Sequence, residues 1–341
     1  MDDGFRSAEG NPASPPYSNG PYVMSEHVTF AGGLTGANTN GHVWYVDGTN
    51  GSAGNNAKSW SNAMNTIQGA VDLAGVGDVI YVAPKTISDA TGDPTSYAEV
   101  VTIGFDTPSL SIIGVSRGRT QGGLPQIKMG SGSTALLTIR AAGCLIANMG
   151  FNGYGSTGSG ILLDDDNSTT TAFGTSIVNC HFKNCVGSAA TADKGGAIVW
   201  GAEGNAWQVL ISGCNFYKNV CDICVLGTSN TVPQDVTIQD CVFSGSAAST
   251  DCNIYTGGSG FGGGLTIDNC IFPKTPALGT TDLFTSITCY GTGGTGVISN
   301  CVFGEAGTTT GYGAAKASAS IGTTIELCNN YSNAGLIVRE A

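Results

Sequence analysis

The sequence predicts an all-β fold in which the chain coils and stacks each strand on its equivalent from the previous turn. Three observations support this prediction. A segment similar to LTIDNCIF, at residues 265–272, recurs every 27 to 34 residues. Apolar and polar residues alternate within each copy, as in a β-strand. Near the middle of most copies stands Asn, Asp or Gly, which tolerate a left-handed backbone. A long, regular repeat of this kind is typical of a solenoid.

Aligning the copies produces three columns. The isoleucine column is Ile146, Ile177, Ile211, Ile238, Ile267, Ile298 and Ile325. The bend column, two residues later, is Asn148, Asn179, Gly213, Asp240, Asn269 and Asn300. The phenylalanine column is Phe151, Phe182, Phe216, Phe243, Phe272 and Phe303. A weaker early copy has Ile112 and a bend at Gly114, and the last copy has Leu327 at the bend and Tyr331 one place late, which predicts a distorted final turn.

The composition of these segments favours strands over a helical solenoid of similar period. Thr, Val, Ile, Gly and Asn are common in them, whereas strong helix formers are scarce. Each coil has one apolar face that it cannot bury alone, so the coils must stack.

Half of the twelve cysteines fall in one column beside the bend. After Met149 this column reads Cys180, Cys214, Cys241, Cys270, Cys301 and Cys328. A free cysteine packs as a small apolar residue. Stacked strands lie about 4.8 Å apart, a spacing that also permits disulfides. The start MDDGFRSAEG lacks the apolar core of a secretory signal, so we expect buried thiols.

Cys221 and Cys224 form a separate C-x-x-C pair. Such a pair can bind a metal or carry redox chemistry, but no second pair or histidine follows at ligand spacing. Core packing is therefore the favoured interpretation, and no metal or cofactor is expected.

The chain divides into an arm, residues 1–41, and a solenoid domain, residues 42–341. The arm is rich in Pro, Gly, Ser and Asn and cannot support a core. We expect its apolar residues to order against a partner and attach the protein there. These attachment residues are Tyr17, Tyr22, Val23, Met24, Val28 and Phe30.

The segment SNAMNTIQGAVDLAG predicts one amphipathic helix. Apolar residues fall at helical spacing, and Ser59 or Ser61 is placed to cap its start. They are Trp60, Ala63, Met64, Ile67, Ala70, Val71 and Ala74. A strand, DVIYVAP, follows. We expect this helix to cover the open end of the solenoid, where bare strand edges invite aggregation.

The segments YVDGTNGS, TIQGAVDLA and GDVIYVAP, with the TIDNCIF-type repeats, resemble right-handed parallel β-helix proteins of the pectin-lyase-like fold. The resemblance covers about residues 43–335 and implies a capped first coil and stacked ladders of bend residues. The family includes polysaccharide lyases and hydrolases, microbial surface proteins, and spikes and fibres of bacteriophage virions. This chain is most similar to the virion proteins, which implies a homotrimer, but fold does not determine function.

The two enzyme mechanisms of this family need different residues. A lyase of this family needs Arg or Lys beside several Asp, yet after Arg140 the next arginine is Arg339. A hydrolase needs two carboxyl groups about 5 to 9.5 Å apart. The candidates are Asp164, Asp165, Asp166 and Glu203, which leave the same sheet edge if Ile161 and Ile198 are neighbours. A solvated acidic loop is the favoured alternative.

Three aromatic residues are candidates for stacking on sugars: Trp200, Trp207 and Tyr217. Partial burial in loops or subunit contacts is the favoured alternative for them.

Composition limits the partners. With a net charge of −12 and 13 basic residues, the chain has no basic surface for nucleic acid or an anionic membrane, and its apolar runs are too short to span a bilayer. Charged residues make up 11% of the chain, so flat neutral faces suit packing between copies.

We therefore expect a virion structural protein, made in the host cytoplasm without a signal peptide, that contacts copies of itself, other virion proteins and, as an option, host-surface polysaccharide. The alternatives are a phage-borne polysaccharide depolymerase and a microbial surface protein.

Overall fold

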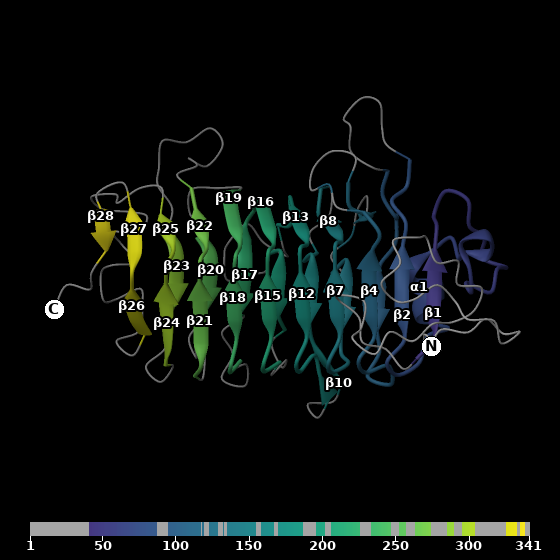
Figure 1. Ribbon diagram of the computed structural model, residues 1–341, viewed down its shortest axis with the longest axis horizontal. Helices are drawn as coiled ribbons and strands as arrows, with labels where there is room; N and C mark the ends of the chain where they lie inside the picture. Colours follow the sequence, from purple (N-terminus) through teal and green to yellow (C-terminus); the bar gives the residue numbers. More distant parts are fainter. Residues whose placement is uncertain are drawn as a thin grey trace, which may run out of the picture. The chain divides into compact units, whose positions relative to one another are not determined.

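The computed structural model describes residues 41–86, 95–116, 118, 123–128, 132, 135–154, 158–166, 170–186, 196–201, 206–225, 233–246, 252–256, 263–273, 285–289, 295–303, 325–332 and 335–337. The six apolar residues predicted to attach the arm lie outside these ranges. The described residues form a solenoid of parallel strands with very little helix (Figure 1). None of the described helices has the length and hydropathy to cross a membrane.

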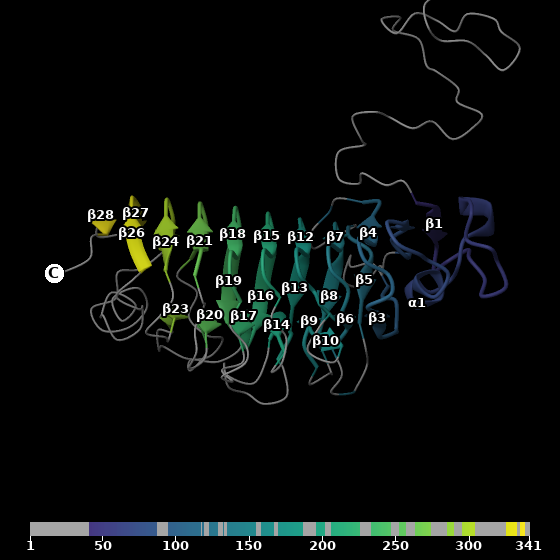
Figure 2. The ribbon, with the colours of Figure 1, turned by 90° about the horizontal axis from the view of Figure 1, so that it is seen from below.

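Three parallel sheets surround one interior, and most coils give one strand to each sheet (Figures 1 and 2). The ten-stranded sheet contains, in stacking order, β1 (Val43–Val46), β2 (Val79–Val82), β4 (Ser111–Gly114), β7 (Leu145–Ala147), β12 (Ser176–Val178), β15 (Leu210–Ser212), β18 (Thr237–Gln239), β21 (Leu265–Asp268), β24 (Gly296–Ser299) and β26 (Ile325–Cys328). The nine-stranded sheet contains β5 (Gln126–Ile127), β8 (Gly150–Asn152), β13 (His181–Lys183), β16 (Asn215–Asn219), β19 (Val242–Ser246), β22 (Ile271–Phe272), β25 (Val302–Phe303), β27 (Asn330–Ser332) and β28 (Gly335–Ile337).

The seven-stranded sheet contains β3 (Val101–Ile103), β6 (Leu137–Ile139), β9 (Ile161–Leu163), β14 (Ile198–Trp200), β17 (Cys221–Val225), β20 (Cys252–Thr256) and β23 (Thr285–Cys289). A separate antiparallel hairpin joins β10 (Asp165–Asp166) to β11 (Thr170–Thr171). At the C-terminal end β28 pairs antiparallel with β27, so the nine-stranded sheet ends in a hairpin. The predicted all-β solenoid of stacked parallel strands is confirmed, while the right-handed sense of coiling stays a prediction.

The isoleucine column lies in the interior as predicted. Strand register pairs Ile112 with Ile146 and continues without a slip through each copy to Ile298. From Ile146 onward these isoleucines are fully buried. A parallel in-register ladder places equal side chains directly above one another, so each isoleucine packs on its equivalents in the neighbouring coils.

The prediction for the last copy was wrong by two residues. Register pairs Ile298 with Leu327, not with Ile325, and Ser299 with Cys328. The left-handed bend accordingly falls at Asn329, with a φ of 53°, instead of at Leu327. Cys328 is therefore exposed and outside the cysteine column. The backbone pairing establishes this register. It also places at the bend an asparagine, which tolerates positive φ better than leucine does.

The bend column has the expected left-handed backbone. Its φ values lie between 49° and 65° at Asn148, Asn179, Gly213, Asp240, Asn269 and Asn300. Side-chain amides link some neighbouring bends, as between Asn269 Nδ2 and Asp240 Oδ1 at 2.7 Å. Gly114 is an exception, because its φ is not positive. It is a glycine because a Cβ there would collide with the carbonyl oxygen of Asn148.

A second column of left-handed residues, which was not predicted, precedes the ten-stranded sheet. Each member lies three residues before a buried isoleucine, at the corner where the chain enters this sheet. The column is Gly77, Ser109, Gly143, Gly174, Gln208, Asp235 and Gly264, with φ between 52° and 74°. Two tight corners per coil therefore keep this sheet in register.

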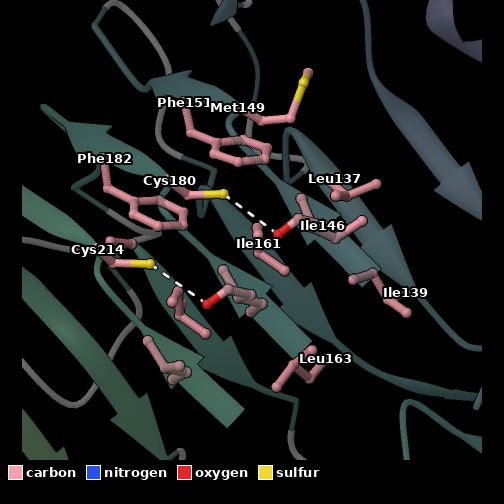
Figure 3. Close-up of a cluster of buried hydrophobic side chains, with 14 of the residues drawn as sticks. Leu137, Ile139, Ile146, Met149, Phe151, Ile161, Leu163, Cys180, Phe182 and Cys214 are labelled. Atoms are coloured by element: carbon pink, nitrogen blue, oxygen red, sulfur yellow. Dashed lines mark hydrogen bonds between the residues drawn. The ribbon is translucent and has the colours of Figure 1, made fainter. Parts of the chain in front are cut away.

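The cysteine column is a ladder of buried free thiols (Figure 3). Cys180 Sγ lies 3.6 Å from the Ile146 carbonyl oxygen of the previous coil, and Cys214 Sγ lies 3.5 Å from that of Ile177. Each thiol also lies near the carbonyl oxygen two residues before it, as Cys241 Sγ does at 3.1 Å from that of Gln239. The thiols thus serve packing and weak hydrogen bonding.

The phenylalanine column is a continuous ring stack in the interior. Successive ring centroids from Phe151 to Phe303 are 4.6 to 5.1 Å apart, and the rings are within 10° of parallel. The spacing follows the distance between coils, so the ladder fixes the ring geometry. All six rings are buried.

The predicted capping helix is present but shorter than expected. A 3-10 turn spans Trp60–Asn62, and α1 spans Ile67–Val71. Thr66 caps α1 by accepting from the Gly69 amide, whereas Ser59 makes no capping hydrogen bond. The Glu99 carboxylate accepts from the Ile67 and Gln68 amides, both at 2.9 Å. The helix contacts β1, β2 and β3, so it covers the first coil.

Candidate carboxylate site at the edge of the seven-stranded sheet

The register of the seven-stranded sheet brings the predicted carboxylate segments to one edge. Ile161 pairs with Ile198, as predicted, and Leu163 pairs with Trp200. Asp164 therefore lies beside Gly201, immediately beyond the two strands. A Cβ on Gly201 would lie 3.0 Å from Asp164 Oδ1, so glycine leaves room for this carboxylate.

Asp164 is held by a basic residue from the preceding coil. Arg140 Nε donates to Asp164 Oδ2 at 3.1 Å, and neither side chain is fully buried. Arg140 directly follows β6, which pairs with β9. The pair therefore orients one carboxylate oxygen of Asp164 toward Arg140.

Asp165 begins the β10–β11 hairpin, where it pairs with Thr171. Its Oδ2 atom is buried with no hydrogen-bond partner among the described residues. The backbone of Asp166 continues the hairpin, but its side chain and all of Glu203 lie outside the described residues. The part of the chain described thus contains the first carboxylate of the predicted pair and not the second.

The three aromatic candidates do not form one surface. Trp200 is fully buried in the core, and its Nε1 donates to the Ala206 carbonyl oxygen at 3.0 Å. Trp200 is therefore not available to stack on a sugar, and burial, the favoured alternative, holds for it. Trp200 lies two residues after Ile198 on β14 and shares its inward orientation.

Trp207 and Tyr217 are exposed on different parts of the solenoid. Trp207 lies at the corner before β15, beside Phe173, with ring centroids 6.3 Å apart. Tyr217 lies on β16 with Lys218 Nζ 5.0 Å from its ring centre. Both side chains are exposed enough to contact a partner.

Cys221 and Cys224 are fully buried. Cys221 Sγ lies 3.1 Å from the Ile223 carbonyl oxygen, and Cys224 packs with Val199. No group of three or more His, Cys, Asp or Glu suited to a metal ion occurs among the described residues. These contacts agree with the packing interpretation of the C-x-x-C pair.

A buried polar network near this pair was not anticipated. Asp222 is buried, and its two carboxylate oxygens accept from Asn219 Nδ2 at 2.8 Å and from Asn253 Nδ2 at 2.6 Å. Asn253 belongs to the next coil, so the carboxylate bridges two coils. The sequence signal was a single aspartate among apolar residues in the strand CDICV.

The sheet topology decides the fold. The chain folds as a parallel β-helix. No family model and no curated protein sequence matches it. Similar solved structures include the native GH136 lacto-N-biosidase from Eubacterium ramulus, with 10% identity, 85% of this chain and 56% of that chain covered, and a TM-score of 0.49.

ORF18 of Geobacillus virus E2 has 12% identity, coverage of 79% and 58%, and a TM-score of 0.40. A pectin methylesterase has 12% identity, coverage of 89% and 92%, and a TM-score of 0.39. The β-helix thus spans little more than half the length of the biosidase and of the viral protein. At these identities the similarity concerns the fold.

Proposed function

We propose that this β-helix is a non-enzymatic structural protein of a bacteriophage virion, such as a fibre, spike or capsid decoration, attached through residues 1–41. The observation that carries the proposal is that the repeated residues pack in the interior of the solenoid. The isoleucine, cysteine and phenylalanine columns run through the coils as continuous buried ladders. The repetition therefore builds a rigid rod, which is what a projecting or covering virion protein needs.

The remaining surface features are compatible with this role. The Asp164 carboxylate accepts a hydrogen bond from Arg140, and Trp200 is buried in the core and does not contribute to the surface. Trp207 and Tyr217 are open for contacts with other virion proteins or a host-surface polysaccharide. The proposal includes self-association, with a homotrimer expected from the sequence resemblance.

Incorporation into particles tests the proposal. The full chain and a variant lacking residues 2–41 are produced during particle assembly, and purified particles are quantified by mass spectrometry. We expect a fixed copy number for the full chain and loss of the deletion variant, with circular dichroism showing that its β-helix remains folded. A full chain missing from particles, or a folded deletion variant retained in them, contradicts the proposal.

A depolymerase is the second candidate, and the paired register of β9 and β14 favours it. That register brings Asp164 to the same edge as the segment that leads to Glu203, and Asp165 has a buried carboxylate oxygen beside it. The test compares glycan shortening by the wild type and by a variant with Asp164→Ala, Asp166→Ala and Glu203→Ala. Cleavage by the wild type that the triple variant lacks would replace the structural proposal with this one.

A further inference from the structure

Five apolar side chains form a continuous stripe along the C-terminal part of the nine-stranded sheet. The apolar stripe is Val242, Ile271, Val302, Tyr331 and Leu336. Register pairs each member with the next, from β19 through β22, β25 and β27 to β28. Ile271, Val302, Tyr331 and Leu336 are 45%, 48%, 45% and 56% exposed, and Val242 is half-buried.

Strand alternation shows why the stripe lies outside. Phe243, Phe272 and Phe303 directly follow Val242, Ile271 and Val302, and these rings stack in the interior. Their predecessors must therefore face outward. Four steps of about 4.8 Å make the stripe about 19 Å long.

The stripe is unusual because its members are contiguous. Single exposed apolar residues are normal, whereas the largest contiguous apolar patch on a monomer, typically about 300 to 600 Å², is often functional. The exposed fractions correspond to an apolar area of roughly 350 Å². A specific interface buries about 800 Å² on each partner, so the stripe can supply its apolar centre and neighbouring polar residues such as Ser244 its rim.

The distribution of charge favours a second copy of this chain as the partner. The five strands that carry the stripe have the sequences VFSGS, IF, VF, NYS and GLI, without a charged residue. The earlier part of the same sheet carries Lys183 and Lys218. The whole chain has a net charge of −12, so two copies repel unless they meet through a neutral surface.

We propose that the apolar stripe is the contact surface between parallel copies of this chain. The proposal rests on the structural function proposed above, to which it adds the interface. The stripe runs along the stacking direction of the coils, so a rotation axis parallel to that direction brings identical residues to the same level. Ile271 then meets Ile271 of the next copy, and Val302 meets Val302. A second copy carries the same stripe with the same spacing between coils, so the two stripes match residue by residue.

Two variants of the full chain test the contact by sedimentation velocity. Val302→Lys places a charge in the stripe, and Val115→Lys makes the same change just after β4, where valine is equally exposed at 48%. We expect the wild type and Val115→Lys to sediment as oligomers. Val302→Lys should raise the dissociation constant by about tenfold or more, because a charge would be buried without a partner.

Cross-linking tests the parallel arrangement. Val302→Cys and Val115→Cys are each made with Cys328→Ser, which removes the exposed cysteine of the described residues. Two facing thiols lose two electrons and two protons to added oxidised glutathione and form one disulfide between copies. We expect covalent dimers from Val302→Cys and none from Val115→Cys.

Each result bears on the proposal. A monomeric wild type, or a Val302→Lys variant that keeps the oligomer, overturns it. Absence of the Val302→Cys cross-link overturns the parallel arrangement. These measurements use purified protein, so failed incorporation into particles would contradict the virion role and leave the interface standing.

Discussion

Truncating one isoleucine of the interior ladder, Ile238→Ala, should destabilise the solenoid by about 4 kcal/mol. Ile238 is fully buried between Ile211 and Ile267 in strict register. Removing three carbon groups loses roughly 2.4 kcal/mol of transfer free energy at about 0.8 kcal/mol each. The cavity of about 75 Å³ adds roughly 1.8 kcal/mol at about 24 cal/mol per Å³.

Little relaxation is expected to reduce this cost. The backbone ladders on both sides hold the coils at their spacing, so neighbouring isoleucines cannot move into the cavity. The assay is urea unfolding followed by circular dichroism, with hydrogen exchange to locate the weakened coils, since contacts in a solenoid are between nearest neighbours.

Thr237→Ala is the matched control. Thr237 is the preceding residue on β18, is only half-buried and faces outward, so its truncation should cost less than about 1 kcal/mol. Equal losses from the two variants would refute the register and the interior position of the isoleucine column.

Three further predictions concern the thiols, the bend ladder and the N-terminal cap. Burial raises the pKa of Cys144 and of Cys185 to about 12, so at pH 8 these two thiols should resist alkylation in the native protein and react after unfolding without reductant. The column thiols from Cys180 to Cys301 should behave in the same way, because they are buried and the reagent cannot reach them. Exposed Cys328 should react first, and native disulfides found by mass spectrometry would contradict this. Hydrogen bonds from Ser299 Oγ and Asn300 Nδ2 hold the pKa of Asp268 below its ordinary value. Its folded pKa is thus lower than its unfolded one, so its stabilising effect is present above about pH 4 and is lost as the pH falls through the folded value. Asp268→Asn should remove that part of the pH dependence of the urea midpoint, and an unchanged profile would count against it. Glu99→Gln should cost about 1 to 3 kcal/mol in urea unfolding, because a neutral amide replaces the carboxylate that accepts two α1 amides; an unaltered midpoint would show that the cap is not held this way.

The interior of the fold was predictable because the same residue types recur at the same spacing. The isoleucine, bend and phenylalanine columns fall where the alignment placed them, except in the last copy and at Gly114, where the backbone is not left-handed. In that copy the alignment was placed on Ile325 because it is an isoleucine. A shift of two residues instead places Leu327 in the isoleucine column and Asn329 at the bend. Requiring a residue that tolerates positive φ would have found the correct register.

Other features lacked a constant residue type. The second column of left-handed residues includes Ser109, Gln208 and Asp235 as well as glycines, so only its position three residues before each isoleucine identifies it. At the candidate site, the strand pairing was predictable from Ile161 and Ile198. The burial of Trp200 was predictable too, since residues two apart on a strand share a face.

The two ends of the cysteine column show what its position requires. Met149 begins the column as a longer apolar side chain, and the register of the final coil places Asn330 where a cysteine would stand. Asn330 Oδ1 accepts from the Cys301 amide at 2.9 Å, and its Nδ2 donates to the Ile298 carbonyl oxygen at 2.8 Å. Within the column, thiols also approach the isoleucine carbonyl of the previous coil, but through longer and weaker contacts. A thiol suits coils that are covered on both sides, because it fills the interior and needs no strong partner. In the final coil, the side chain at this position can form hydrogen bonds with backbone groups of the coil before it. The Asn330 side-chain amide forms stronger hydrogen bonds there than a thiol would.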